Sequence, residues 1–268
     1  MVPTDVILAS DLNRDYLDFW PLTSRAWARL GLRATLILVA ASDEVPRELV
    51  NAPNVRVFEP LAGVATSLQA TCVRLLYAAL IDAPGAVLMS DIDLVPLNRR
   101  FFYEPLAALD ERFFVAFRDD YEDPVIAWPL PFNAAAPATW GEVFRVASVQ
   151  DVRARLAEWT RDIPYEGRGE TGWFTDQRKL RDALMAWPAR DQRLWVLSRR
   201  LTGERRLYRY NVTWWRRVLA RSGYYTDLHV PLDLAQRYAG ISADDGDERP
   251  RLRPGRLLRA HARTFIRH

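Results

Sequence analysis

The segment Ala34–Ala40 restricts the fold more than any other feature of this 268-residue chain. It reads Ala-Thr-Leu-Ile-Leu-Val-Ala, an almost continuous apolar run. Such runs are typical of strands in a parallel sheet whose two faces are both covered. Shorter apolar runs at Val6–Ala9, Val55–Phe58 and Ala86–Met89 predict further buried strands.

Amphipathic segments separate these strands. Apolar residues recur at helical spacing over residues 19–30, where Pro21 fits only the first turn and Gly31 ends the helix. A second helix is predicted to begin with a capping box formed by Thr66 and Gln69. The alternation of strands and helices predicts an α/β fold with a mostly parallel, Rossmann-like sheet and helices on both faces.

The pattern becomes less regular after about residue 130. Helices are predicted over residues 139–146, 150–160 and 177–186, and short strands at 194–197 and 207–210. We therefore expect one domain over residues 1–240, with a regular half (1–130) and a smaller mixed half (131–240). Residues 241–268 read as an acidic linker followed by a basic tail.

Composition narrows the class of protein. Hydrophobic residues make up 49% and charged residues 26%, as in ordinary globular domains. Acidic residues are interspersed with the arginines, so the body of the chain lacks the basic stripe of a nucleic-acid-binding protein. The single cysteine, Cys72, excludes an intramolecular disulfide. Without a signal-like N-terminus or a long apolar run, we expect a soluble, cytoplasmic protein.

The triplet Asp91-Ile92-Asp93 follows the predicted strand Ala86–Met89. Residues i and i+2 of a strand point to the same side, so we expect both carboxylates to project together at the carboxyl edge of the sheet. A divalent cation, Mn²⁺ or Mg²⁺, bridging to a diphosphate suits such a pair. A second triplet at Asp245–Asp247 has no strand before it and reads as a solvated linker.

Other short motifs occur in order around this triplet. They are the loop Ser10–Tyr16, Arg74 seventeen residues before Asp91, the strand end Val87–Asp93, Phe132-Asn133-Ala134-Ala135, Thr175-Asp176-Gln177 and Asp227-Leu228-His229. Together they resemble the GT-A glycosyltransferases, in particular the branch that includes glycogenin and the bacterial lipopolysaccharide galactosyltransferases. The resemblance extends over about residues 6–231 as a series of short motifs.

The resemblance implies a GT-A fold with a nucleotide-sugar-binding half and an acceptor half. It also implies a metal-dependent hexosyltransferase that moves a sugar from a nucleotide-sugar, by default a UDP-sugar, to a hydroxyl of a glycan or lipid-linked saccharide. The donor-binding residues that it implies are Ser10, Tyr16, Arg74, Asp91, Asn133 and Ala134. The metal ligands that it implies are Asp91, Asp93 and His229.

Asp176 is the catalytic candidate. It would act as the base if the enzyme inverts the anomeric centre, and would orient or stabilise the sugar if the enzyme retains it. Simpler structural roles stand beside these functional ones. Arg74 could lie in solvent, Tyr16 could be a packing aromatic and Asp176 could cap a helix.

The sequence departs from the family pattern in two places. Ala135 replaces the usual glycine, and Val230-Pro231-Leu232 stands where a lysine-bearing segment usually follows the late histidine, so a phosphate partner is unassigned. Two alternative functions stand beside this one. A sugar nucleotidyltransferase would need a glycine-rich loop after the first strand, which Ser10–Asn13 lacks, and a non-catalytic carbohydrate-binding protein would not need the acidic residues.

The C-terminal tail carries a basic stripe. On a helix, Arg256, Arg259, Arg263 and Arg267 share one side, and apolar residues gather on the other. This helix would either pack its apolar side on the domain or lie on an anionic membrane, which would place the protein peripherally at the inner membrane face.

Overall fold

The computed structural model describes residues 1–118, 128–197, 206–207 and 224–229. They contain a seven-stranded sheet with the order β3-β2-β1-β4-β7-β6-β8. Its strands are β1 (Pro3–Asp11), β2 (Arg33–Val39), β3 (Val55–Phe58), β4 (Ala86–Met89), β6 (Phe114–Ala116), β7 (Asn133–Ala135) and β8 (Leu194–Val196). Only β7 runs antiparallel to its neighbours. The prediction of a mostly parallel α/β sheet is confirmed.

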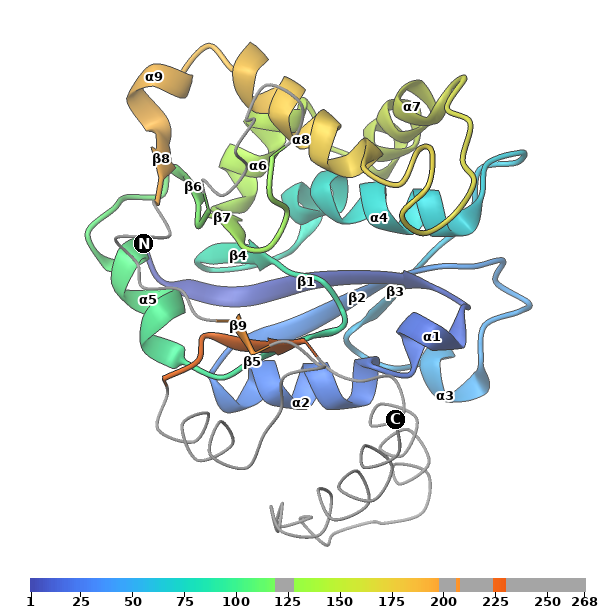
Figure 1. The fold of residues 1–268 in the computed structure, drawn as a ribbon, viewed down its shortest axis with the longest axis horizontal. Helices are drawn as coiled ribbons and strands as arrows, with labels where there is room; N and C mark the ends of the chain where they lie inside the picture. Colours follow the sequence, from blue (N-terminus) through green and yellow to red (C-terminus); the bar gives the residue numbers. More distant parts are fainter. Residues whose placement is uncertain (119–127, 198–205, 208–223, 230–268) are drawn as a thin grey trace, which may run out of the picture.

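Helices cover both faces of the sheet (Figure 1). One face carries α2 (Trp20–Arg29) and α5 (Arg99–Ala107), and the other carries α4 (Thr66–Tyr77), α6 (Pro137–Phe144), α7 (Val149–Thr160) and α8 (Thr175–Ala186). Shorter helices are α1 (Arg14–Leu17), α3 (Arg47–Val50), α9 (Arg190–Arg193) and the 3₁₀ turn η1 (Ala78–Leu80). As predicted, α2 has Pro21 in its first turn and is followed by Gly31 at a positive φ of 89°.

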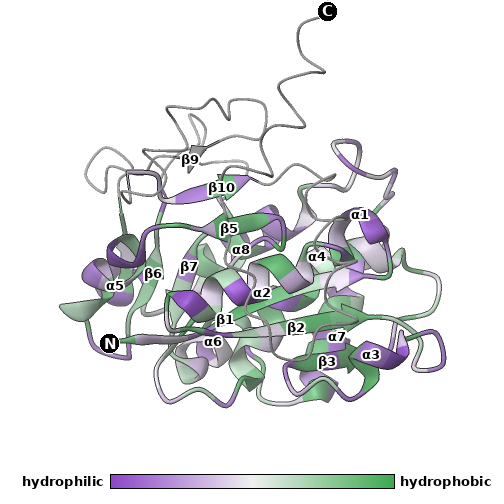
Figure 2. Cartoon of the chain, turned by 90° about the horizontal axis from the view of Figure 1, so that it is seen from below, coloured by the Kyte–Doolittle hydropathy of each residue, from purple (hydrophilic) through white to green (hydrophobic). Residues whose placement is uncertain are grey.

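The core consists of two apolar layers, one on each face of the sheet. Along β1, Ile7 belongs to the layer under α4 and Leu8 to the layer under α2, and along β2 the same alternation holds for Ile37 and Leu38. This is what a strand buried on both faces requires, since successive side chains point to opposite sides. Figure 2 shows the central strands coloured largely as hydrophobic, with hydrophilic residues on the surrounding helices and loops.

The predicted capping box at the start of α4 is wrong. Ala65 occupies the cap position and makes no side-chain capping bond. Gln69 is fully buried and instead bonds the preceding loop, accepting from Leu61 N at 2.8 Å and donating to Val64 O at 2.9 Å. Thr66 donates to Asp11 Oδ2 at 2.9 Å, so α4 is tied to the end of β1.

A second sheet has the order β5-β10-β9, with β5 (Leu94–Pro96), β10 (Asp227–His229) and β9 (Arg206–Leu207). β10 is antiparallel to β5, and its register sets His229 opposite Leu94. This pairing brings a late segment of the chain to the turn that follows β4.

The seven-stranded sheet contains strands from both sides of residue 130, and the predicted division into two halves stays a prediction. The tail 241–268 with its arginine stripe, the triplet Asp245–Asp247 and the segment Val230–Leu232 lie outside the described residues. Among the described helices, none has both the length and the apolar character needed to cross a membrane.

Candidate active site

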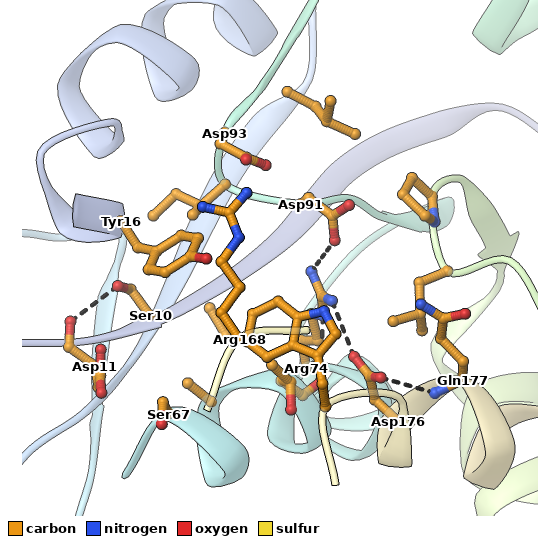
Figure 3. Close-up of a pocket in the computed structure, with 18 of the residues that line it drawn as sticks. Ser10, Asp11, Tyr16, Ser67, Arg74, Asp91, Asp93, Arg168, Asp176 and Gln177 are labelled. Atoms are coloured by element: carbon orange, nitrogen blue, oxygen red, sulfur yellow. Dashed lines mark hydrogen bonds and ion pairs between the residues drawn. The ribbon is translucent and has the colours of Figure 1, made fainter. Parts of the chain in front are cut away.

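A cavity of about 250 Å³ lies at the carboxyl edge of β1 and β4. This is the edge at which open α/β sheets usually bind ligands. Its polar and aromatic lining consists of Ser10, Asp11, Tyr16, Ser67, Thr71, Arg74, Asp91, Asp93, Arg168, Trp173, Asp176, Gln177 and His229. The cavity therefore gathers most of the residues that the sequence motifs singled out (Figure 3).

Asp91 and Asp93 both line the cavity, as predicted, but they do so from the turn between β4 and β5 and not from a strand. Leu94 N donates to Asp91 O at 3.3 Å across this turn. Ile92 is buried in the core layer under α2, where its carbonyl accepts from the Thr23 hydroxyl at 2.7 Å. Anchoring Ile92 on the core side leaves its two acidic neighbours on the cavity side.

Asp93 and His229 form a close pair. The distance from Asp93 Oδ2 to His229 Nε2 is 2.8 Å, and both side chains are mostly buried. The pairing of β10 with β5 accounts for the contact, because it sets His229 beside the residue that follows Asp93. The structure thus brings together two of the three residues expected to hold a metal.

Arg74 joins two acidic residues from different elements of the fold. Its Nη1 lies 2.5 Å from Asp91 Oδ1, and its Nη2 lies 3.2 Å from Asp176 Oδ2 (Figure 3). Nη1 also donates to Ser90 O at 3.1 Å. The Arg74 side chain is only 8% exposed, so the alternative that it lies in solvent is wrong.

Asp176 stands in the first turn of α8, almost entirely buried. Burial raises the pKa of its carboxyl group to about 6, and the negative charge of Asp91 adds to the rise while Arg74 opposes it. Its Oδ1 accepts from Gln177 N at 2.8 Å. Such a carboxyl group changes its charge close to neutral pH.

The loop after β1 is held in place by Asp11. Its Oδ1 accepts from Asn13 N at 3.1 Å, while Oδ2 accepts from Thr66 on α4. Ser10 donates to Asp11 O at 2.8 Å and is itself buried. These bonds fix the chain up to α1, where Tyr16 contributes an aromatic side chain to the cavity wall.

Asn133 and Ala134 occupy β7 and are fully buried. The Asn133 amide donates to Pro129 O at 3.0 Å and to Leu130 O at 2.5 Å. Leu130 lines the cavity, so Asn133 shapes the wall through that segment. Neither Asn133 nor Ala134 is part of the described cavity lining, and their donor contact stays a prediction.

A divalent cation fits part of this lining. The Asp93 carboxylate and the His229 imidazole are donors that Mn²⁺ accepts, and both are already adjacent. A carboxylate has lone pairs beyond the one that an arginine uses, so Asp91 could also contribute an oxygen. Within the described part of the chain, however, no three acidic, histidine or cysteine side chains stand close enough to form a complete site.

The sequence motifs do not include three polar residues of the lining: Ser67, Thr71 and Arg168. The signal for the first two was present, because Ser67, Thr71 and Arg74 follow a spacing of four and three residues and share one face of α4. Arg168 stands between Gly167 and Gly169 in a loop that has no periodicity, and only its glycine neighbours mark it in the sequence.

Sequence comparison finds no matching family model and no matching curated protein. Solved structures of glycosyltransferases are similar to this one. The galactosyltransferase LgtC, in complex with donor and acceptor sugar analogs, has 14% identity and a TM-score of 0.48, with 91% of this chain and 98% of that chain covered.

Two further structures show the same kind of likeness. The glycosyltransferase GlyE of Streptococcus pneumoniae TIGR4 has 14% identity and a TM-score of 0.47, with 89% of this chain and 60% of that chain covered. A Drosophila galactosyltransferase mutant in complex with manganese, UDP-Gal and xylobiose has 15% identity and a TM-score of 0.36, with 74% of this chain and 65% of that chain covered. Because each TM-score is below 0.5, the chemistry of the present site has to be judged from its own residues.

Proposed function

We propose that this protein is a metal-dependent glycosyltransferase that transfers a sugar from a nucleotide-sugar, by default a UDP-sugar, to a hydroxyl group of a saccharide acceptor. The observation that carries the proposal is the composition of one cavity. It combines the Asp93–His229 pair, the acidic residues bridged by Arg74, and the aromatic ring of Tyr16.

These groups match the parts of a nucleotide-sugar. An aromatic ring suits a nucleobase, and a carboxylate–imidazole pair suits the cation that accompanies a diphosphate. Hydrogen-bonding residues on the remaining walls, such as Asp176 and Gln177, suit the hydroxyl groups of a sugar. Trp173 adds an aromatic side chain to the lining.

When bound, the cation would be held by Asp93, His229 and an oxygen of Asp91, and it would supply electrostatic stabilisation for a leaving diphosphate. Arg74 keeps Asp91 in place through their ion pair. Asp176, on α8, orients Arg74 through a second ion pair. With a pKa of about 6, the Asp176 carboxylate can also accept a proton from an acceptor hydroxyl near neutral pH.

The proposal is tested by incubating the protein with a panel of nucleotide-sugars and Mn²⁺, with and without a panel of simple saccharides, and detecting hydrolysis or transfer by mass spectrometry. We expect turnover of at least one donor, its loss in EDTA, and its loss in Asp91→Ala and Asp93→Ala variants that remain folded by circular dichroism. The matched control is Asp247→Ala in the second Asp-x-Asp triplet, for which we expect unchanged turnover.

Full turnover in EDTA would remove the metal from the mechanism. Release of pyrophosphate from a nucleoside triphosphate and a sugar phosphate, without any transfer from nucleotide-sugars, would instead favour a sugar nucleotidyltransferase. Metal-dependent nucleotide binding without turnover of any donor would favour a non-catalytic binding protein.

A further inference from the structure

Arg168 is a cavity residue to which no motif assigns a role. It lies in the connection between α7 and α8, and its guanidinium is directed into the cavity, on the side of Tyr16 (Figure 3). Its Cζ atom is 5.8 Å from the centre of the Tyr16 ring. The residue therefore reaches the site from an element distinct from those that carry the acidic residues.

The loop around Arg168 has a defined shape. Glu166 N donates to Thr171 O at 3.1 Å, and Glu170 N donates to Gly167 O at 3.3 Å, so the chain folds back on itself with Arg168 at the tip. Gly167 and Gly169 on either side have φ values of 111° and 80°, which glycine adopts more readily than other residues. The local sequence thus holds an arginine at the end of a tight turn.

The two cavity arginines differ in their partners. Arg74 is buried and forms ion pairs with two carboxylates. Arg168 is exposed, and within the described residues it forms no ion pair with a carboxylate. Its charge is consequently available to a ligand, whereas that of Arg74 is already compensated.

The position of Arg168 indicates which kind of ligand it would bind. A nucleoside diphosphate with its base on Tyr16 and its cation at Asp93 and His229 would carry its phosphates between these two points. Arg168 contacts Tyr16 and lines the same cavity as Asp93. An arginine fork binds phosphate oxygens with two parallel hydrogen bonds.

The charge of the lining leads to the same ligand. Four aspartates (Asp11, Asp91, Asp93 and Asp176) stand against two arginines, so a bare anion is not favoured by the cavity as a whole. A diphosphate bound together with a divalent cation would satisfy both kinds of charge. The cation would lie at the aspartates, and the phosphate oxygens would lie at Arg168.

We propose that Arg168, presented by the glycine-flanked turn between α7 and α8, binds the diphosphate of the nucleotide donor. This assignment rests on the proposed function, because it presupposes a nucleotide in the cavity. Arg168 binds the phosphates, whereas Tyr16 binds the base. Removal of the Arg168 side chain therefore weakens the binding of nucleoside diphosphates more than the binding of nucleosides.

The test compares UDP, GDP, ADP and CDP with their nucleosides by calorimetry in the presence of Mn²⁺, using full-length wild-type protein, Arg168→Ala and Arg168→Lys. For the diphosphate that binds wild type best, we expect affinity to fall about 10- to 100-fold in Arg168→Ala and to be partly restored in Arg168→Lys. Affinity for the matching nucleoside should not fall. The matched control is Arg161→Ala, an exposed arginine at the start of the same connection that is not part of the cavity lining.

The two hypotheses fail in different ways. If wild type binds no nucleoside diphosphate with Mn²⁺, the proposed function is wrong. If wild type binds one and Arg168→Ala binds it equally well, or if nucleoside and diphosphate lose affinity by the same factor, only the assignment of Arg168 is wrong. The salt dependence of diphosphate binding gives a second readout, which should weaken in Arg168→Ala because one phosphate-neutralising charge is lost.

Discussion

Asp93 and His229 are 136 positions apart in the sequence, yet Oδ2 of the one lies 2.8 Å from Nε2 of the other. The contact depends on the pairing of β10 with β5 in the smaller sheet. It places an imidazole against a carboxylate at the edge where the larger sheet ends.

Replacement of His229 by alanine should weaken binding of Mn²⁺ together with the nucleotide by at least about tenfold, or about 1.4 kcal/mol, because one donor is lost. Titration of Mn²⁺ in the presence of UDP measures the effect. His261→Ala, in the tail, is the matched histidine control and should leave the affinity unchanged. Equal affinity in wild type and His229→Ala would show that the histidine binds no metal.

Replacement of Arg74 by alanine should lower the free energy of unfolding by about 3–5 kcal/mol, because it leaves the buried Asp176 and the partly buried Asp91 without their common cation. Arg74→Lys keeps the charge but cannot reach both carboxylates with one planar group, so its loss should be smaller. Urea denaturation at pH 8 measures both. The loss in Arg74→Ala should shrink at pH 5, where Asp176 takes up a proton; a loss that does not depend on pH would contradict this explanation.

Asp176 should make stability depend on pH in a defined direction. Its pKa is about 6 in the folded protein, above the value of 3.8 that is ordinary for an aspartate, so the folded state binds more protons than the unfolded state between these two values. The contribution of this carboxyl group to the free energy of unfolding is therefore highest below about pH 4. It falls as the pH rises through about 6, by up to about 1.4 kcal/mol per pH unit.

Denaturation of wild type and Asp176→Asn in EDTA, between pH 4 and pH 8, tests this. The difference in unfolding free energy between them should change across pH 4–6 and become constant above about pH 7. A constant difference throughout would show that the carboxyl group titrates normally. Near-normal turnover of Asp176→Asn at pH 7 would separately exclude it as the base.

Replacement of Gly172 by alanine should destabilise the protein more than the same replacement at Gly63, which has nearly the same φ. Its φ is 82°, and an added Cβ would lie 2.7 Å from Pro164 O, whereas Gly63 has a φ of 75° and open space around it. Gly63→Ala should cost about 1–2 kcal/mol from backbone strain alone. Gly172→Ala should cost more and should also weaken UDP binding, because the loop that carries Arg168 would have to move. Thermal denaturation and calorimetry measure both effects, and equal losses in the two variants would contradict the steric argument.

The larger sheet could be predicted from the sequence because its signals are local. The run at Ala34–Ala40 needs only its own residues to specify a strand buried on both faces, and the structure has β2 at Arg33–Val39. The strand Ala86–Met89 was predicted with its bounds. The cap of α4 was predicted wrongly, because the Gln69 side chain forms hydrogen bonds with the loop at Leu61. A capping rule considers only residues at the helix start and does not include such a contact.

The acidic turn of the site was also visible in the sequence, whereas its partners were decided by the tertiary structure. Asp91 and Asp93 follow a recognisable strand, so their position at the sheet edge needed only the end of that strand. Whether Arg74 faces solvent or two carboxylates depends on how α4 lies against α8, 102 positions away at Asp176. His229 and Arg168 reach the cavity through a strand pairing and a loop, which bring distant segments together and leave no periodic signal in the residues themselves.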